Sequence, residues 1–169
     1  PEFQSELDAV ARNLVERFQG NAVDSTLGAT DAGLFTDGGN FFDATDEVGL
    51  SRRMQLNDLV SQDGSAEIWR IRDGLGATSI GAIGNGEILN SLKAALSSQT
   101  LVQSGELSGQ QSTLNQLSSN LLSSVGTSLT VAEDAQSYAS ARNSEVTERK
   151  LQSGVDSDTE LQRLLQIEK

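Results

Sequence analysis

The stretch "LLSSVGTSLTVAEDAQSYASARNSEVTERKLQ", residues 121–152, decides the fold of this chain. It contains no proline, and its apolar side chains recur near the helical period of about 3.6 residues. The same stripe begins upstream, and its members are Leu114, Leu117, Leu121, Val125, Leu129, Ala132, Ala139 and Val146. The pattern predicts a continuous or slightly kinked helical rod from Gly109 to about Gln152.

The stripe changes from leucine to alanine after Leu129. Small side chains let two helices approach closely, but they bury little apolar area, at roughly 25 cal/mol per Å². Gly126 weakens the helix further, by about 1 kcal/mol relative to alanine. We therefore expect the rod to depend on packing against another long helix.

The stretch "SGVDSDTELQRLL", residues 153–165, predicts a helix corner after the rod. Gly154 fits the left-handed residue that ends a helix. Ser157 and Glu160 have the spacing of a capping box for the next helix, and aspartates beside Ser157 suit its positive end. The predicted corner residues are Gly154, Val155, Asp156, Ser157, Asp158 and Glu160.

A new apolar stripe begins at Leu161, Leu164 and Leu165, barely two turns before Lys169. Isolated short helices are marginal in water. We interpret residues 153–169 as the corner and the start of a truncated terminal helix. The three leucines are the predicted subunit-interaction residues.

One helix is predicted near the start of the chain, over residues 4–20. Its apolar face would hold Leu7, Val10, Ala11, Leu14, Val15 and Phe18. Ser5 is the expected N-cap, with Asp8 three residues on, and Gly20 is the expected C-terminal stop. Pro1–Phe3 is interpreted as a cloning scar outside the fold.

Residues 21–86 predict a loop-rich region with short strand or helix pieces. Phe35, Phe41 and Phe42 are expected to pack this region onto the helices, and a short strand is expected at Met54 and Leu56. Ser65–Gly74 favours a short helix capped by Ser65, with a strand as the alternative. The helical rod domain, residues 87–152, would open with a helix that points Ile88, Leu89, Leu92 and Leu96 inward.

The fold class predicted from these elements is mainly α. Long antiparallel helices would form an elongated helical bundle, with the loop-rich region and at most a short β element. Hydrophobic residues make up 36% of the chain and aromatic residues only 4%, which suits long, half-exposed helices better than a thick core.

Composition excludes several functions. The formal net charge is −12, which disfavours nucleic acid and anionic membrane surfaces as partners. The chain has no cysteine and no histidine, so thiol nucleophiles, Cys/His zinc sites and histidine acid–base catalysis are absent. No apolar run reaches the length of a membrane span, and no secretory signal opens the chain. We predict no catalytic residue, no cofactor and no metal.

Two other stretches resemble binding loops only superficially. Residues 37–47 cluster acids around glycines but lack the spacing of a calcium loop, so a solvated turn is the favoured interpretation. Residues 74–86 are glycine-rich but lack the GK[ST] of a phosphate loop, which favours a connector.

The corner and the rod together resemble a known family. Gly154, Val155, Asp156, Asp158, Glu160 and Leu161 match the SGVNLDEE-type corner of bacterial flagellar axial proteins, whereas Ser157 and Thr159 depart from it. Residues 121–152 are similar to the long helix of the hook-associated protein 1 family, the first hook–filament junction proteins. "ELDAVARNLVERFQ" followed by "GLFTDGGNFFDA" also resembles this family, so the likeness covers most of the chain.

This resemblance implies a structural subunit that is exported unfolded through the flagellar type III apparatus without a cleaved signal. It would self-associate into a ring at the hook–filament junction, outside the cell, and contact hook protein and the second junction protein. The chain would be the C-terminal half without its last helix, to which an export chaperone would bind.

Two alternatives from other classes stay open. A secreted or soluble coiled-coil binding module would share the acidic charge and serine-rich helix, but would sustain a stricter heptad. An enzyme using carboxylates alone, of a glycosidase-like kind, would need two acids facing each other in a pocket.

Overall fold

The computed structural model describes residues 2–152 and 157–167. Over these residues the chain is mainly α-helical with two small antiparallel sheets, so the predicted mainly α class is confirmed. In chain order the elements are α1 (Glu2–Phe18), β1 (Phe35–Asp37), the 3₁₀ helix η1 (Ala44–Asp46), α2 (Leu50–Arg53), β2 (Met54–Leu56), α3 (Trp69–Asp73), α4 (Glu87–Ser97), β3 (Thr100–Leu101), β4 (Gln111–Ser112), α5 (Leu114–Gln152) and α6 (Ser157–Ile167).

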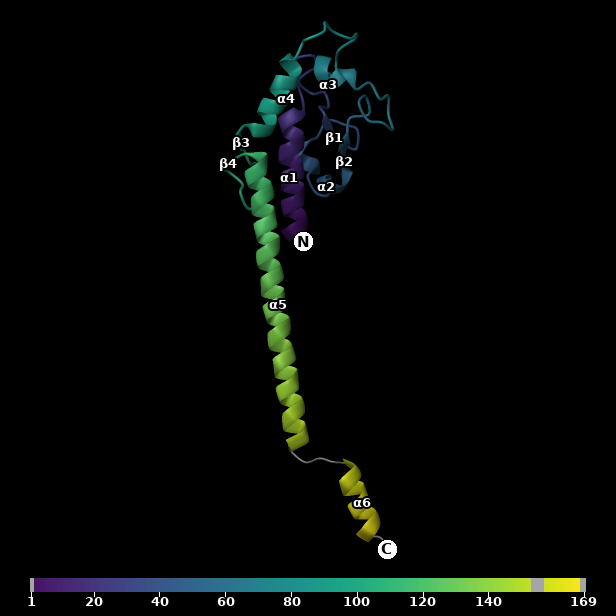
Figure 1. Ribbon diagram of the computed structural model, residues 1–169, viewed down its shortest axis with the longest axis vertical. Helices are drawn as coiled ribbons and strands as arrows, with labels where there is room; N and C mark the ends of the chain where they lie inside the picture. The colour runs from purple at the N-terminus through teal and green to yellow at the C-terminus, as the bar shows by residue number, and fades with distance from the viewer. Residues whose placement is uncertain (1, 153–156, 168–169) are drawn as a thin grey trace. The chain divides into compact units, whose positions relative to one another are not determined.

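The chain divides into two compact units, Pro1–Ser123 and Ser124–Lys169, here called the N-terminal unit and the C-terminal unit. The N-terminal unit holds the elements from α1 to β4 and the first turns of α5 (Figure 1). The C-terminal unit holds the rest of α5, together with α6. Both sheets therefore belong to the N-terminal unit.

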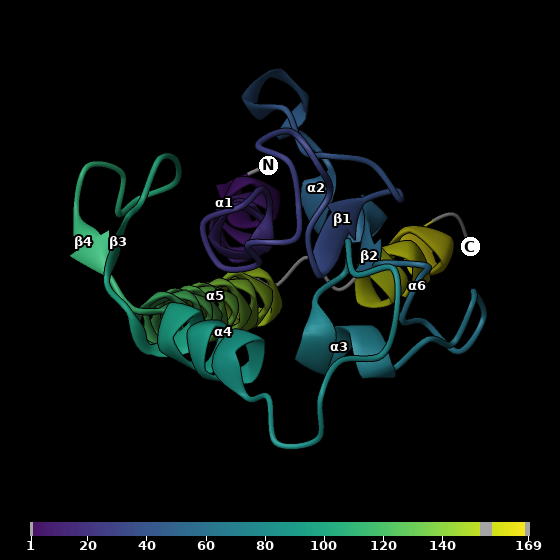
Figure 2. The same cartoon turned by 90° about the horizontal axis from the view of Figure 1, so that it is seen from above.

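Helix α1 lies at the centre of the N-terminal unit. Figure 2 shows α2 and β1 on one side of it, and α4 with the first turns of α5 on another. Val15 is fully buried and packs with Ala11, Phe42 and Leu50 in the main hydrophobic cluster. Of the apolar face predicted for α1, Ala11, Val15 and Phe18 are buried, whereas Leu7, Val10 and Leu14 are only partly buried.

Two of the three phenylalanines predicted to hold the loop region do so. Phe42 lies in the main hydrophobic cluster, and Phe35 meets Phe18 edge-on with ring centres 5.4 Å apart. Phe41 is exposed instead. Gly20 follows the end of α1 with φ at +68°, as expected for a helix stop.

The predicted N-cap of α1 is wrong. Helix α1 begins at Glu2, so Ser5 lies inside it, and Glu2 and Phe3, interpreted as part of a scar, belong to its first turn. Asp8 caps another helix: its carboxylate accepts hydrogen bonds from the amides of Gly49 and Ser51, at 2.8 and 2.9 Å. Gly49, the N-cap of α2, has no side chain of its own to do this.

The first sheet pairs β1 with β2, with Phe35 opposite Leu56 and Asp37 opposite Met54. The strand predicted at Met54–Leu56 is confirmed, but its partner was not predicted. The Asp37 carboxylate and the Arg53 guanidinium, 2.7 Å apart, join the end of β1 to α2.

The second sheet, in which β3 pairs with β4, interrupts the chain between α4 and α5. The rod therefore begins at Leu114 rather than Gly109, and it is helical as far as Gln152, after which residues 153–156 lie outside the described part of the chain. Gly105 and Gly109 both have positive φ and turn the chain here, which a continuing helix does not allow.

Two details of the short helices differ from expectation. Helix α3 begins at Trp69, and Ser65 does not cap it, because Ala66 takes a positive φ of 54° before the helix starts. In α4, Leu89 and Leu96 are nearly half exposed rather than inward. This helix instead buries Ile88 and Ala95, seven residues apart on one face.

Candidate assembly surface

The first turn of α5 is fixed by a capping box. The Gln116 amide donates to Oγ1 of Thr113 at 3.2 Å, and the Thr113 amide donates to Oε1 of Gln116 at 2.8 Å. Leu117, one turn on, is buried in the N-terminal unit. The start of the helix, Thr113–Leu117, is therefore held in place by hydrogen bonds and burial, and is called the root of α5 below.

From Val125 to Gln152 every residue of α5 is exposed. At about 1.5 Å per residue, the whole helix of 39 residues is about 58 Å long. Its exposed apolar side chains include Leu122, Val125, Leu129, Val131, Tyr138, Val146 and Leu151. Successive residues of a helix are rotated by about 100°, so Leu122, Val125, Leu129 and Leu151 share one side of α5, whereas Val131 and Tyr138 lie on the opposite side.

The exposed part of α5 changes in charge along its length. Residues 114–132 contain no Asp, Glu, Lys or Arg. Charged side chains begin at Glu133, and the helix then carries an ion pair between Glu145 and Arg149, whose atoms lie 2.6 Å apart. The uncharged half of the helix is therefore suited to close helix packing.

Helix α6 presents the predicted interaction leucines to solvent. Leu161, Leu164 and Leu165 are 60%, 63% and 59% exposed, and their spacing places them on one face. Glu160, from the predicted corner, is exposed as well. Within the described residues nothing covers this apolar face.

The remaining corner residues are described only in part. Gly154, Val155 and Asp156 lie outside the described residues. Helix α6 begins at Ser157, and the side chains of Ser157 and Asp158 lie outside the description too. The capping box proposed for this corner stays a prediction.

The acidic loop at residues 37–47 has internal partners. Asp37 pairs with Arg53, and Glu47 pairs with Arg12 at 2.7 Å. Asp43 accepts from the Thr45 amide and hydroxyl, which hold the pKa of Asp43 below its ordinary value. In the described part of the chain, no group of three or more acidic side chains could hold a metal ion.

Sequence reasoning missed a buried arginine. Arg17 is 6% exposed, and burial lowers its pKa. Its guanidinium donates to the carbonyls of Ala95 at 2.9 Å, Ser98 at 2.7 Å and Ser112 at 2.8 Å. A helix-periodicity search counts apolar positions only, and nothing local in the sequence marks this residue as buried.

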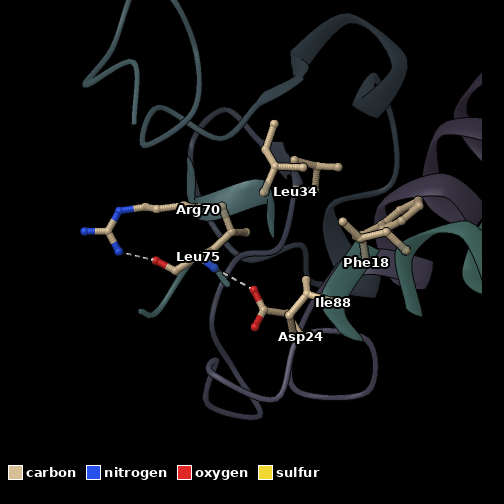
Figure 3. A pocket seen from close by; sticks show the side chains of 8 residues that line it. Phe18, Asp24, Leu34, Arg70, Leu75 and Ile88 are labelled. Atoms are coloured by element: carbon tan, nitrogen blue, oxygen red, sulfur yellow. Dashed lines mark hydrogen bonds between the residues drawn. The ribbon is translucent and has the colours of Figure 1, made fainter. Parts of the chain in front are cut away.

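A small pocket lies between α1, α3 and α4 (Figure 3). Phe18, Leu34 and Ile88 line it, while Asp24 accepts a hydrogen bond from the Leu75 amide at 2.6 Å. The pocket holds about 10 Å³, room for about one water molecule, and the one carboxylate in it is engaged. It is a packing defect rather than a ligand site.

An open groove of about 450 Å³ runs between α1 and α4. Its walls include Glu16, Arg17 and the alanines of α4. Glu16 is held by Arg12 at 2.8 Å, and Arg17 by backbone carbonyls, so no facing pair of acids is available for catalysis.

No helix in residues 2–152 or 157–167 combines the length and apolar character needed to cross a lipid bilayer. No protein-family model matches the sequence, and neither a curated protein nor a solved structure matches it significantly.

Proposed function

We propose that this chain is a structural subunit of the bacterial flagellum, which joins hook to filament as part of a junction ring. The subunit is exported through the flagellar apparatus and assembles outside the cell. Its proposed partners are other copies of itself, hook protein, the second junction protein and an export chaperone. It needs no cofactor.

The observation that carries this proposal is the exposure of apolar side chains on α5 and, separately, on α6. Exposed leucines and valines extend along α5, and three more leucines lie together on α6. Burying one such side chain fully contributes about 1.5–3 kcal/mol. A chain with several of them in water gains stability from partner helices.

The resemblance described for residues 121–152 and 153–165 supports the same proposal. Within these ranges, residues 125–152 of α5 and 160–165 of α6 are exposed and do not belong to the core of the N-terminal unit. In the proposed assembly, long antiparallel helices cover the apolar face of α5 and form an elongated bundle. The N-terminal unit is then attached to the outside of that bundle.

The mechanism is mechanical rather than chemical. Identical subunits in a ring present the same faces to one another. A modest binding free energy at each contact is therefore repeated around the ring. The uncharged segment 114–132 allows close packing without burying unpaired charge.

Gene disruption in the source bacterium tests the proposal. Hooks without filaments, seen by electron microscopy, together with flagellin leaking into the medium, would support the junction role. Normal filaments would refute it and favour the coiled-coil binding module.

A second experiment tests the leucines of α6 directly. The triple variant Leu161→Ser, Leu164→Ser, Leu165→Ser, made in the full gene, is expected to abolish filament growth while the protein is still produced. The matched control is Gln162→Ala with Gln166→Ala, on the same helix. Filaments of normal number in the triple variant would exclude these leucines from the interface.

A further inference from the structure

Two arginines on α1 join it to different parts of the N-terminal unit. Arg17 reaches α4 and β4, as described above, and its side chain also bonds Oδ1 of Asn13 at 2.7 Å. Arg12 reaches the loop region, where it pairs with Glu47 and lies over the ring of Phe42, 5.9 Å from its centre.

The two sets of contacts do not share residues beyond α1. On the side of Arg12, the main hydrophobic cluster brings Phe42 and Leu50 against Ala11 and Val15. Ala95, whose carbonyl Arg17 contacts, and Val102 and Leu117 are also buried but lie outside that cluster. The residues that the two arginines reach are here called the two halves of the N-terminal unit.

The half held by Arg17 has the weaker construction. Its sheet pairs only two residues with two, and the hydroxyl of Ser104 is buried without a hydrogen-bond partner among the described residues. The hairpin loop is tied to α1 through the carboxylate of Glu6, which accepts from the Glu106 amide at 2.8 Å. A buried polar group without a partner weakens the structure around it.

Arg17 adds hydrogen bonds to those that Glu6 and Asn13 make with this half; Asn13 donates to Oγ1 of Thr100 at 3.1 Å. Four of the five N–H donors of Arg17 serve this half or the Asn13 side chain, and the oxygens that accept them are all neutral. Two of these oxygens, the carbonyls of Ala95 and Ser98, belong to the negative end of α4. Losing this side chain removes a donor from three carbonyls at once, those of Ala95, Ser98 and Ser112.

We propose that residues 98–117 form a latch that detaches from α1 in one cooperative step while the main hydrophobic cluster stays folded, and that Arg17 controls this step. Opening the latch frees the root of α5, because Ser112 directly precedes the capping box at Thr113. The inference concerns the N-terminal unit by itself and does not depend on the flagellar role.

Native-state hydrogen exchange on the unmodified chain tests the latch. With urea added well below the unfolding midpoint, amides in residues 98–117 should exchange through an opening distinct from the global one. Amides of Ala11–Phe18 and of β2 should exchange only through global unfolding. Identical opening free energies and urea dependences for both sets would overturn the proposal.

A pair of variants tests the role of Arg17. Arg17→Gln is expected to accelerate exchange in residues 98–117 by at least about tenfold, because charge-assisted hydrogen bonds are lost, with little change around Leu50. The matched control, Arg12→Gln on the same helix, should accelerate exchange around Phe42 and Leu50 instead.

Arg17→Lys separates charge from geometry, since lysine keeps the cation but cannot reach three carbonyls at once. We expect it to fall between the unmodified chain and Arg17→Gln. Uniform acceleration across the N-terminal unit in Arg17→Gln, or none in residues 98–117, would show that Arg17 does not control a latch. If Arg17→Gln does not fold, the Arg17→Lys variant and the urea experiment still decide the question.

Discussion

Leu50 in the N-terminal unit is fully buried, whereas Leu129, in the exposed part of α5, is 58% exposed. The N-terminal unit also buries Asp8, Asn13 and Arg17, each with hydrogen-bond partners. From Val125 to Gln152, the long helix keeps even its leucines in water. What separates the two regions is contacts between residues distant in sequence, because both regions are rich in Ser and other polar residues.

The largest expected effect is on the free energy of unfolding, and it separates two Leu→Ala substitutions, one at a buried and one at an exposed position. Leu50→Ala should lower the free energy of unfolding of the N-terminal unit by about 2–5 kcal/mol, since it opens a cavity beside Val15. Leu129→Ala, at an exposed position, should change it by less than about 0.5 kcal/mol. Urea titration followed by fluorescence of Trp69, the single tryptophan, measures both. A large effect from Leu129→Ala would mean that α5 is already covered in solution.

The second-largest effect is expected from Asp8→Ala, which should lower the free energy of unfolding by about 2–3 kcal/mol in the same titration. The carboxylate accepts hydrogen bonds from the Gly49 and Ser51 amides, the Ser51 hydroxyl and the Gln4 amide. Removing it leaves buried donors without acceptors. The control is Asp31→Ala, on an exposed loop, which should cost much less.

Asp8 also predicts how stability depends on pH. Burial alone would raise its pKa, but the hydrogen bonds from Ser51, Gly49 and Gln4 lower it below the ordinary value of 3.8. A carboxylate with a lowered folded-state pKa stabilises the fold above its unfolded pKa. The contribution should vanish as pH falls from about 4 through the folded value, and Asp8→Asn should flatten this part of the pH profile. An unchanged profile in Asp8→Asn would assign the acid sensitivity to other groups.

Gly126→Ala should strengthen α5 by about 1 kcal/mol, because the helix gains propensity and an added methyl group meets nothing within 4 Å. Slower amide exchange in residues 121–131 is the measurement. Gly74→Ala makes the contrasting control: it has a φ of +108°, and a side chain there would collide with Thr26. It should destabilise the N-terminal unit. If Gly126→Ala were destabilising, a close partner would already occupy that face.

The smallest expected effect is that of Glu145→Gln. The ion pair with Arg149 is exposed, with side chains 59% and 75% accessible, and such pairs contribute at most about 0.5 kcal/mol. Helix content by circular dichroism should change little, and less still in high salt. A loss above about 1 kcal/mol would place this pair in an interface.

Local patterns predicted those elements that follow from local chemistry. Helical periodicity indicated the buried residues of α1 around Val15 and the course of α5 as far as Gln152. Alternation indicated the strand at Met54–Leu56. The capping box at Thr113 and Gln116 has a recognisable spacing and was overlooked, because the rod was expected to begin earlier.

The partner of a strand and the burial of a polar side chain could not be predicted in the same way. Strand β1 exists because Phe35 lies opposite Leu56, 21 positions away in the chain, and β3 because it meets β4 across a glycine turn. Arg17 is buried because three carbonyls from distant segments converge on it. Such convergence depends on the whole fold.

The held root of α5 has a kinetic consequence. Starting a helix is the costly step, since several residues must be ordered before the first hydrogen bond is gained, while each further residue adds one bond. Thr113, Gln116 and the buried Leu117 supply that nucleus ready-made. Helix growth then proceeds in one direction, away from the N-terminal unit, and melting retreats along the same line from Gln152. We therefore expect α5 to fray from its far end, and a partner helix that binds α5 to order it progressively from Thr113 toward Gln152.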